Sequence, residues 1–329
     1  MSKLDAASAD TTSVGTRITP FIASDKALID VHSWQPAISS NAAIRGVVLL
    51  IHGMAEHAAR YQRLGVALAN AGIALYAPDL RGHGRTATNQ PLGHFADSNG
   101  WVRVLADVTE LHAYILQRHP HAPIVLKGHS MGSFIAQAYF AQLPAATSTK
   151  PSFAGLIMSG STLNQPVLLA LAQAVAGFER KRQGALGRSA VIDYLSFGAF
   201  NNAFKPSRTA YDWLSRDAAE VDAYVADALC GFRCTNQLWL DLLGGLRDLG
   251  KLDASQSLHK NVPLWLLGGE FDPVAKGGGL HRLANRYMNA GFSAVDMTVY
   301  PGGRHEMLNE TNRELVLADV VNWVNKRVK

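Results

Sequence analysis

Short apolar runs alternate with amphipathic stretches in the first half of the chain, and this alternation constrains the fold more than any other feature. Runs with the length and β-branched content of buried strands lie at 46–53, 73–80, 123–130 and 153–160. Apolar residues at helical spacing fill the intervals, at 60–72, at 101–119 and from Ser130 onward. Strands separated by helices predict a parallel sheet with helices on both faces. Residues 16–34 alternate apolar and polar side chains and predict an antiparallel hairpin at the sheet edge.

Residues 162–255 interrupt this pattern, because no convincing strand appears among them. Helical segments are predicted instead at 166–182, 207–229 and 236–250. The last segment has one apolar face, formed by Leu238, Trp239, Leu242, Leu243, Leu246 and Leu249. Strands resume at 262–269 and 294–302, with one helix between them and another at 315–328.

An insertion of roughly ninety residues is longer than any ordinary connection. Because ligands bind at the carboxyl edge of open α/β sheets, we expect this insertion to cap that edge. We therefore predict a disordered leader at 1–15, an α/β core at 16–161 and 256–329, and a helical cap at 162–255, inserted after the sixth strand.

The stretch VLKGHSMGSF places Ser130 between Gly128 and Gly132. A random chain of this length contains a Gly-x-Ser-x-Gly pattern in about one case in ten, so the motif needs support from its surroundings. Ser130 ends a predicted strand and opens a predicted helix, which is the setting of a nucleophile elbow. A serine that only caps the helix is the alternative interpretation.

A nucleophilic serine needs a base, and the base needs an acid that orients it. In this architecture the acid and then the histidine follow the serine along the chain, each after a late strand. Asp272 follows the strand at 262–269, and His305 lies in a glycine-rich loop after the last strand. Glu270 is the most serious rival for the acid. The other candidates fit less well, since they precede the strand or lie within a helix: Asp253, His259 and His281.

Charge that develops on a substrate carbonyl oxygen needs hydrogen-bond donors, which form an oxyanion hole. One donor should be the backbone N–H of Met131, the residue after the nucleophile. The second should come from the loop after the strand at 46–53, most simply the N–H of Met54. Since both donors belong to the main chain, methionine side chains at these positions are no objection.

The composition excludes several other functions. The net charge of +5 is spread along the chain without a lysine-rich tail or a nucleic-acid-binding motif, so we expect no nucleic-acid partner. The N-terminal residues are polar and small and have no apolar core of signal-peptide length, which predicts a cytoplasmic protein. The longest apolar run, 166–178, has 13 residues and is too short to span a bilayer.

The two cysteines, Cys230 and Cys234, predict neither a disulfide framework nor a metal centre. No other cysteine or histidine cluster near them in the sequence completes a ligand set, so we expect reduced, structural thiols. Because a serine, a histidine and an aspartate suffice for acyl transfer, we predict no cofactor and no metal ion.

Three motifs carry a resemblance to a known family. HGMAEHAARY (52–61), APDLRGHGRT (77–86) and GHSMGS (128–133) resemble the monoacylglycerol lipase and lysophospholipase branch, a serine aminopeptidase S33-like branch, of the α/β-hydrolases. The chain departs from the usual pattern at Thr86 and Ser133, where we expect packing adjustments only. Several residues of the first two motifs are interpreted as loop-shaping residues outside the catalytic triad: His52, Glu56, His57, Arg81 and His83.

The resemblance implies an α/β-hydrolase fold and a serine carboxylic-ester hydrolase that forms an acyl-enzyme. Ser130 would be the nucleophile, His305 the base and Asp272 the orienting acid. Monoacylglycerols, lysophospholipids and small esters are all implied substrates, and the cap would select among them. Two alternatives stay open: hydrolysis of another bond, as by an aminopeptidase or a lactonase, and a non-catalytic binding protein.

The apolar run at 166–178 lies in the expected cap. It could line an acyl tunnel or make transient contact with a lipid surface, and ordinary cap core is an equally good interpretation. Acyl chain length, head group and oligomeric state do not follow from these residues.

Overall fold

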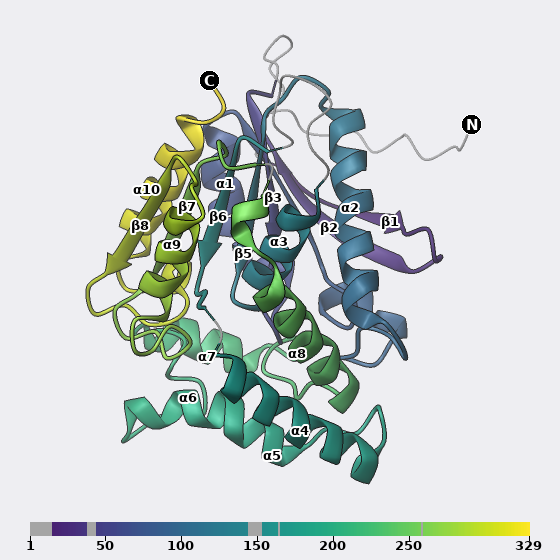
Figure 1. Ribbon diagram of the computed structural model, residues 1–329. Helices are drawn as coiled ribbons and strands as arrows, with labels where there is room; N and C mark the ends of the chain where they lie inside the picture. Colours follow the sequence, from purple (N-terminus) through teal and green to yellow (C-terminus); the bar gives the residue numbers. More distant parts are fainter. Residues whose placement is uncertain (1–14, 38–43, 144–152, 164, 258) are drawn as a thin grey trace.

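The computed structural model describes residues 15–37, 44–143, 153–163, 165–257 and 259–329. Their strands form one eight-stranded sheet in the order β1-β2-β4-β3-β5-β6-β7-β8 (Figure 1). The strands are β1 Gly15–Ile22, β2 Leu28–Gln35, β3 Gly46–Ile51, β4 Ile73–Pro78, β5 Ile124–His129, β6 Gly155–Ser159, β7 Leu264–Gly269 and β8 Val295–Tyr300. The leader predicted at 1–15 lies, apart from Gly15, outside the described residues.

The sheet is parallel except at one edge. β1 and β2 form the predicted antiparallel hairpin, and β2 pairs antiparallel to β4. From β4 to β8 every neighbouring pair is parallel. The prediction of a mostly parallel α/β sheet is therefore confirmed, and β3, β4, β5, β6 and β7 are buried along their whole length, as strands covered on both faces should be.

Helices cover both faces and enclose two separate apolar cores. One core holds buried residues of α1 (Gln62–Asn70) and α10 (Arg313–Asn325). The other holds those of α2 (Gly100–Arg118), α3 (Met131–Gln142) and α9 (Gly279–Asn289). Among the described residues, no helix is both long enough and apolar enough to cross a membrane.

Between β6 and β7 the chain forms helices without adding a strand to the sheet in the residues described there. These are α4 Pro166–Gln183, α5 Ala190–Asp193, α6 Ala199–Asn201, α7 Ala218–Ala226 and α8 Asn236–Lys251. In Figure 1, α4 to α7 form a layer below the lower end of the sheet, whereas α8 rises beside α3.

Helix α8 buries apolar side chains on two of its faces. Leu238, Leu242, Leu246 and Leu249 belong to the core under α2 and α3, as part of the apolar face expected from the sequence. Leu243 packs instead with α4 and α5, where the half-buried Trp239 joins it. The helix thus links the insertion to the sheet domain through buried side chains on both sides.

The helix predicted at 207–229 is wrong over most of its length, since only α7, Ala218–Ala226, is helical there. Asp212 accepts hydrogen bonds from the backbone N–H groups three and four residues before it, which folds this stretch into a turn. Asp217 caps the start of α7. Aspartate side chains that bind nearby backbone groups compete with helix formation, and two of them divide this segment.

Candidate active site

Ser130 occupies a strained turn between β5 and α3. Its backbone torsions are φ 51° and ψ −122°, a region that non-glycine residues rarely adopt. Its N–H donates a hydrogen bond to the carbonyl of Ser159 at the end of β6, at 2.9 Å. Strain of this kind persists only where the surroundings enforce it, and it is typical of functional sites.

The two glycines of the motif make this turn sterically feasible. A Cβ on Gly128 would lie 2.4 Å from the carbonyl oxygen of Gly132, and a Cβ on Gly132 would lie 2.1 Å from that of Ile51. The first glycine lets the chain fold back on itself, and the second lets α3 start against the end of β3. Both roles explain the spacing of the Gly-x-Ser-x-Gly motif physically.

His305 and Asp272 form a buried pair. His305 Nδ1 and Asp272 Oδ1 are 2.9 Å apart, and neither side chain is appreciably exposed. Asp272 Oδ1 also accepts from the N–H of Val274. Burial opposes protonation of His305, but the charge of Asp272 and its hydrogen bond outweigh burial and raise the pKa of His305 above its usual value. The rival acid Glu270 is exposed and accepts from the N–H of Gly302.

Ser130 and His305 both lie against the end of β6. Ser159 accepts from the N–H of Ser130, and a Cβ on the next residue, Gly160, would lie 2.7 Å from His305 Cε1. Among the described residues, His305 Nε2 is buried and has no hydrogen-bond partner, Ser130 Oγ included. Hydrogen bonds between nucleophile and base are often long before substrate binds. The structure thus brings the three predicted residues to one edge of the sheet.

The loop after β3 lies directly against the elbow. A Cβ on Gly53, the residue before Met54, would lie 3.2 Å from Ser130 Cβ. Ala55 has a positive φ of 53°, and its carbonyl accepts from Tyr224 Oη at 2.8 Å and from Gly231 N–H at 3.0 Å. Segment 224–231 of the insertion therefore holds this loop in place.

Two buried carboxylates beside this loop share one guanidinium. Arg60 donates to Glu56 Oε2 at 2.9 Å and to both oxygens of Glu306 at 2.6 Å. Burial alone would raise the pKa of Glu56 and of Glu306, but the charge of Arg60 holds both below the usual range. Glu56 also accepts from the N–H of Gly53 and from Tyr61 Oη, which shapes the loop.

The other motif residues bind backbone and neighbouring side chains, as residues that shape loops would. His52 Nδ1 bonds to the carbonyl of Gly53, and its Nε2 accepts from the N–H of Leu80. Arg81 forms a two-pronged ion pair with Asp107. His83 is wholly buried, and burial lowers its pKa to about 3.

Both cysteines are buried and free. The sequence showed no histidine cluster near the cysteines, but the fold brings His57 and Asp227 close to Cys230. One possible ligand atom from each of the three lies within 4.8 Å of the others. His57 Nε2 already bonds to Asp227 Oδ2 at 2.8 Å, and burial raises the pKa of the Cys230 thiol. The hydrogen bond between His57 and Asp227 already uses two of these three groups, and we assign no metal to them.

Sequence reasoning did not identify two neighbours of the triad. Trp213 comes from the insertion, and its ring centroid lies 4.9 Å from that of His305. Lys127 lies in β5, is wholly buried and donates to Ser159 Oγ. A charged residue in an otherwise apolar strand was a signal for Lys127, whereas no local pattern indicates the position of Trp213.

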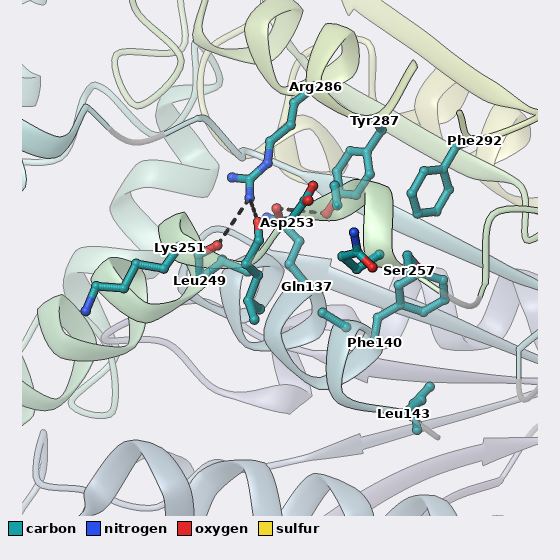
Figure 2. A pocket seen from close by; sticks show the side chains of 14 residues that line it. Gln137, Phe140, Leu143, Leu249, Lys251, Asp253, Ser257, Arg286, Tyr287 and Phe292 are labelled. Atoms are coloured by element: carbon teal, nitrogen blue, oxygen red, sulfur yellow. Dashed lines mark hydrogen bonds between the residues drawn. The ribbon is translucent and has the colours of Figure 1, made fainter. Parts of the chain in front are cut away.

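Two cavities lie away from this site. One, of about 370 Å³, lies between α3, α9 and the end of α8, where Tyr287 Oη donates to Gln137 and Arg286 caps the last carbonyls of α8 (Figure 2). A neighbouring cavity of about 490 Å³ reaches α4 and shares Gln137 and Arg286. None of Ser130, Asp272 and His305 lines either cavity.

A sheet in this order, with a serine in a strained turn after its fifth strand, defines the class of the α/β-hydrolases. The family described as "Serine aminopeptidase, S33" matches residues 42–312. The chain is 30% identical over 285 residues to a monoacylglycerol lipase of Mycolicibacterium smegmatis, covering 85% of this chain and 88% of that one. It is 28% identical over 301 residues to the human monoglyceride lipase, covering 89% and 86%.

Solved structures agree on the fold. A carboxyl esterase from Bacillus coagulans matches with a TM-score of 0.83 at 22% identity, over 96% of this chain and all of that one. A soluble variant of monoglyceride lipase from Saccharomyces cerevisiae matches with a TM-score of 0.72 at 20% identity, over 98% of each chain. The chain belongs to the serine aminopeptidase S33 family of α/β-hydrolases, and it is a serine hydrolase that resembles the monoacylglycerol lipases.

Proposed function

We propose that this protein hydrolyses carboxylic esters, with monoacylglycerols as the leading substrate class, through Ser130, His305 and Asp272. The buried pair of His305 and Asp272 carries this proposal, because it leaves His305 Nε2 unbonded beside the strained serine turn. An imidazole held by a carboxylate at one nitrogen and free at the other is arranged to take a proton.

The reaction proceeds by acyl transfer. Ser130 Oγ attacks the ester carbonyl while His305 Nε2 takes its proton, and a tetrahedral oxyanion forms. The C–O bond to the alcohol then breaks, and His305 returns the proton to the leaving alkoxide. Water activated by His305 attacks the acyl-serine and releases the carboxylic acid. Asp272 holds the histidine tautomer in both halves of the reaction.

The oxyanion is proposed to accept hydrogen bonds from the backbone N–H groups of Met54 and Met131. Met131 opens α3, where the first N–H groups of a helix have no partner within the helix. The loop that carries Met54 contacts Ser130 through Gly53. Backbone donors fixed in this way do not reorganise as the charge develops, and each contributes about 3 kcal/mol to related reactions.

The ester reaction is favoured over an aminopeptidase reaction by the charges beside the loop. An aminopeptidase needs a carboxylate free to bind the substrate's ammonium group. Glu56 and Glu306 both bind Arg60. The names of the relatives agree with an ester substrate, since those reported above are monoacylglycerol and monoglyceride lipases. Acyl chain length would depend on the region proposed as a cap, 162–255.

Helix α4 is proposed to contact the lipid that carries the substrate. Four large apolar side chains on it are exposed: Val167 by 85%, Leu168 by 63%, Leu171 by 62% and Phe178 by 64%. Exposed apolar residues gathered on one element are typical of surfaces that bind apolar partners. The cytoplasmic location remains a prediction from the sequence.

A fluorophosphonate probe tests the nucleophile. We expect the folded protein to be labelled once, and Ser130→Ala to abolish labelling. Ser133→Ala, on the first turn of the same helix, is the control and should keep it. Labelling that survives Ser130→Ala would exclude Ser130 as the nucleophile.

A panel of substrates tests the bond and the chain length. Monoacylglycerols, lysophospholipids and p-nitrophenyl esters of graded length should be hydrolysed, and aminoacyl amides should not. Faster cleavage of aminoacyl amides than of every ester would contradict the proposed substrate class.

A further inference from the structure

Lys127 is a buried cation for which the reaction above has no use. It lies in β5 three residues before Ser130, and its side chain is fully excluded from solvent. Its Nζ donates to Ser159 Oγ at 3.3 Å. Burial lowers the pKa of Lys127 to about 8, against the opposing effect of the Glu56 charge, so the group still carries its charge at neutral pH. A buried charge costs stability unless it is paired and hydrogen-bonded.

The charges around it explain why a lysine is tolerated at this position. Glu56 and Glu306 together carry two negative charges, and Arg60 neutralises only one of them. The ammonium of Lys127 brings this buried group of side chains to zero net charge. Lys127 therefore belongs electrostatically to the network beside the oxyanion loop.

The contacts of Ser159 favour one direction for its hydroxyl proton. An ammonium can only donate, so Ser159 Oγ accepts from Lys127. The buried hydroxyl keeps one proton to donate, and His129 Nδ1, 2.9 Å away, is the acceptor beside it among the described residues. If Nδ1 accepts that proton, a neutral His129 holds its own proton on Nε2.

We propose that Lys127 and Ser159 are positioning residues that keep His129 neutral and protonated at Nε2 beside His305. The rings of His129 and His305 are 4.8 Å apart between centroids. This inference rests on the proposed function, since it assigns these residues a role in the step that charges His305.

The tautomer of His129 matters when His305 takes the proton of Ser130 and becomes an imidazolium. A second positive ring at this distance would oppose that step. Burial and the neighbouring His305 hold the pKa of His129 well below its usual range, and the Ser159 hydroxyl binds the ring nitrogen at which a second proton would add. The charged groups near His129 include Glu306, Lys127, Arg60 and Glu56, and Asp272 binds Nδ1 of His305.

The tautomer of His129 is measured directly by ¹⁵N NMR of the intact protein labelled at histidine. We expect Nε2–H in the wild type. Ser159→Ala removes the donor to Nδ1 and should release the other tautomer. Ser161→Ala is the matched control, because Ser161 is equally buried but bonds to Gln137. An Nδ1–H tautomer in the wild type, or an unchanged tautomer in Ser159→Ala, would overturn the proposal.

Lys127→Met tests Lys127 itself, because it removes both the charge and the donor to Ser159 Oγ. Ser159 can then accept from His129 Nδ1, so we expect the Nδ1–H tautomer to appear in the ¹⁵N spectrum of this variant. A spectrum of Lys127→Met that keeps Nε2–H alone overturns the role of Lys127. The NMR measurement needs no turnover. If the wild type shows the expected tautomer of His129 but fluorophosphonate does not label it, the proposed function is overturned. The roles of Lys127 and Ser159 in setting that tautomer would still be supported.

Discussion

The sheet core and the helical insertion bury their apolar side chains to different degrees. Every residue of strands β3 to β7 is buried, and helices close both faces of the sheet. Helix α4 leaves Val167, Leu168, Leu171 and Phe178 in solvent, and α5 with the turn after it exposes Val191, Tyr194 and Leu195. The core therefore fixes the geometry of the reacting groups, while the insertion offers an apolar surface outward.

Asp272→Asn should have the largest effect, because it acts on the reacting groups in the core. The amide would favour the wrong tautomer of His305, and we expect kcat to fall about 10⁴-fold with the fold intact. Steady-state kinetics measure kcat, and circular dichroism checks that the fold is intact. Glu270→Gln is the control and should retain near-normal kcat. The reverse result would move the orienting role to Glu270.

Truncating a core leucine tests the difference in burial itself. Leu266→Ala in β7 should lower the free energy of unfolding by about 2–5 kcal/mol, since it leaves a cavity. Leu171→Ala on α4 should change it by less than about 0.5 kcal/mol. Urea titration compares the two. Equal losses would show that α4 is packed as tightly as the sheet.

Charging α4 should weaken lipid binding without affecting the core. Leu171→Glu should reduce binding to phosphatidylcholine vesicles about tenfold, because the carboxylate resists transfer from water. Leu315→Glu, on α10 and similarly exposed, is the control and should bind like the wild type. Vesicle flotation gives the bound fraction. Equal binding of all three proteins would remove α4 from the lipid contact.

The smallest expected effect is a displacement of the acidic limb of the pH profile. His305 must be neutral to take the serine proton, and the charge of Asp272 raises its pKa. Activity should therefore fall as pH drops through a midpoint above about 6.5, the ordinary value for histidine. Leu171→Ala in the insertion should leave this midpoint unchanged. A wild-type midpoint below that value would contradict the raised pKa.

The sequence allowed the sheet to be predicted well, because strands buried on both faces have continuous apolar runs that local reading detects. The elbow at Ser130 and the positions of Asp272 and His305 could also be predicted, because each of these residues follows the end of a strand. Their catalytic roles stay predictions. The insertion was harder to predict, because short aspartate-capped turns around Asp212 and Asp217 resemble a helix in composition.

Contacts between segments far apart in the sequence could not be predicted. Trp213 reaches His305 from far along the chain, and the bonds from Tyr224 and Gly231 to Ala55 join segments with no shared sequence pattern. Lys127 stood out in the strand, but its partner Ser159 follows from the pairing of β5 with β6.

The double hydrogen bond at the carbonyl of Ala55 limits how the enzyme can admit a substrate. Tyr224 and Gly231 tie one side of the insertion to the loop that carries Met54. If that side swung outward, it would pull the loop away from Ser130 at the moment when the carbonyl arrives. We therefore expect any movement of the insertion that admits a substrate to involve α4 and α5, while the α7 side stays fixed. Access and catalysis would then depend on different parts of one insertion.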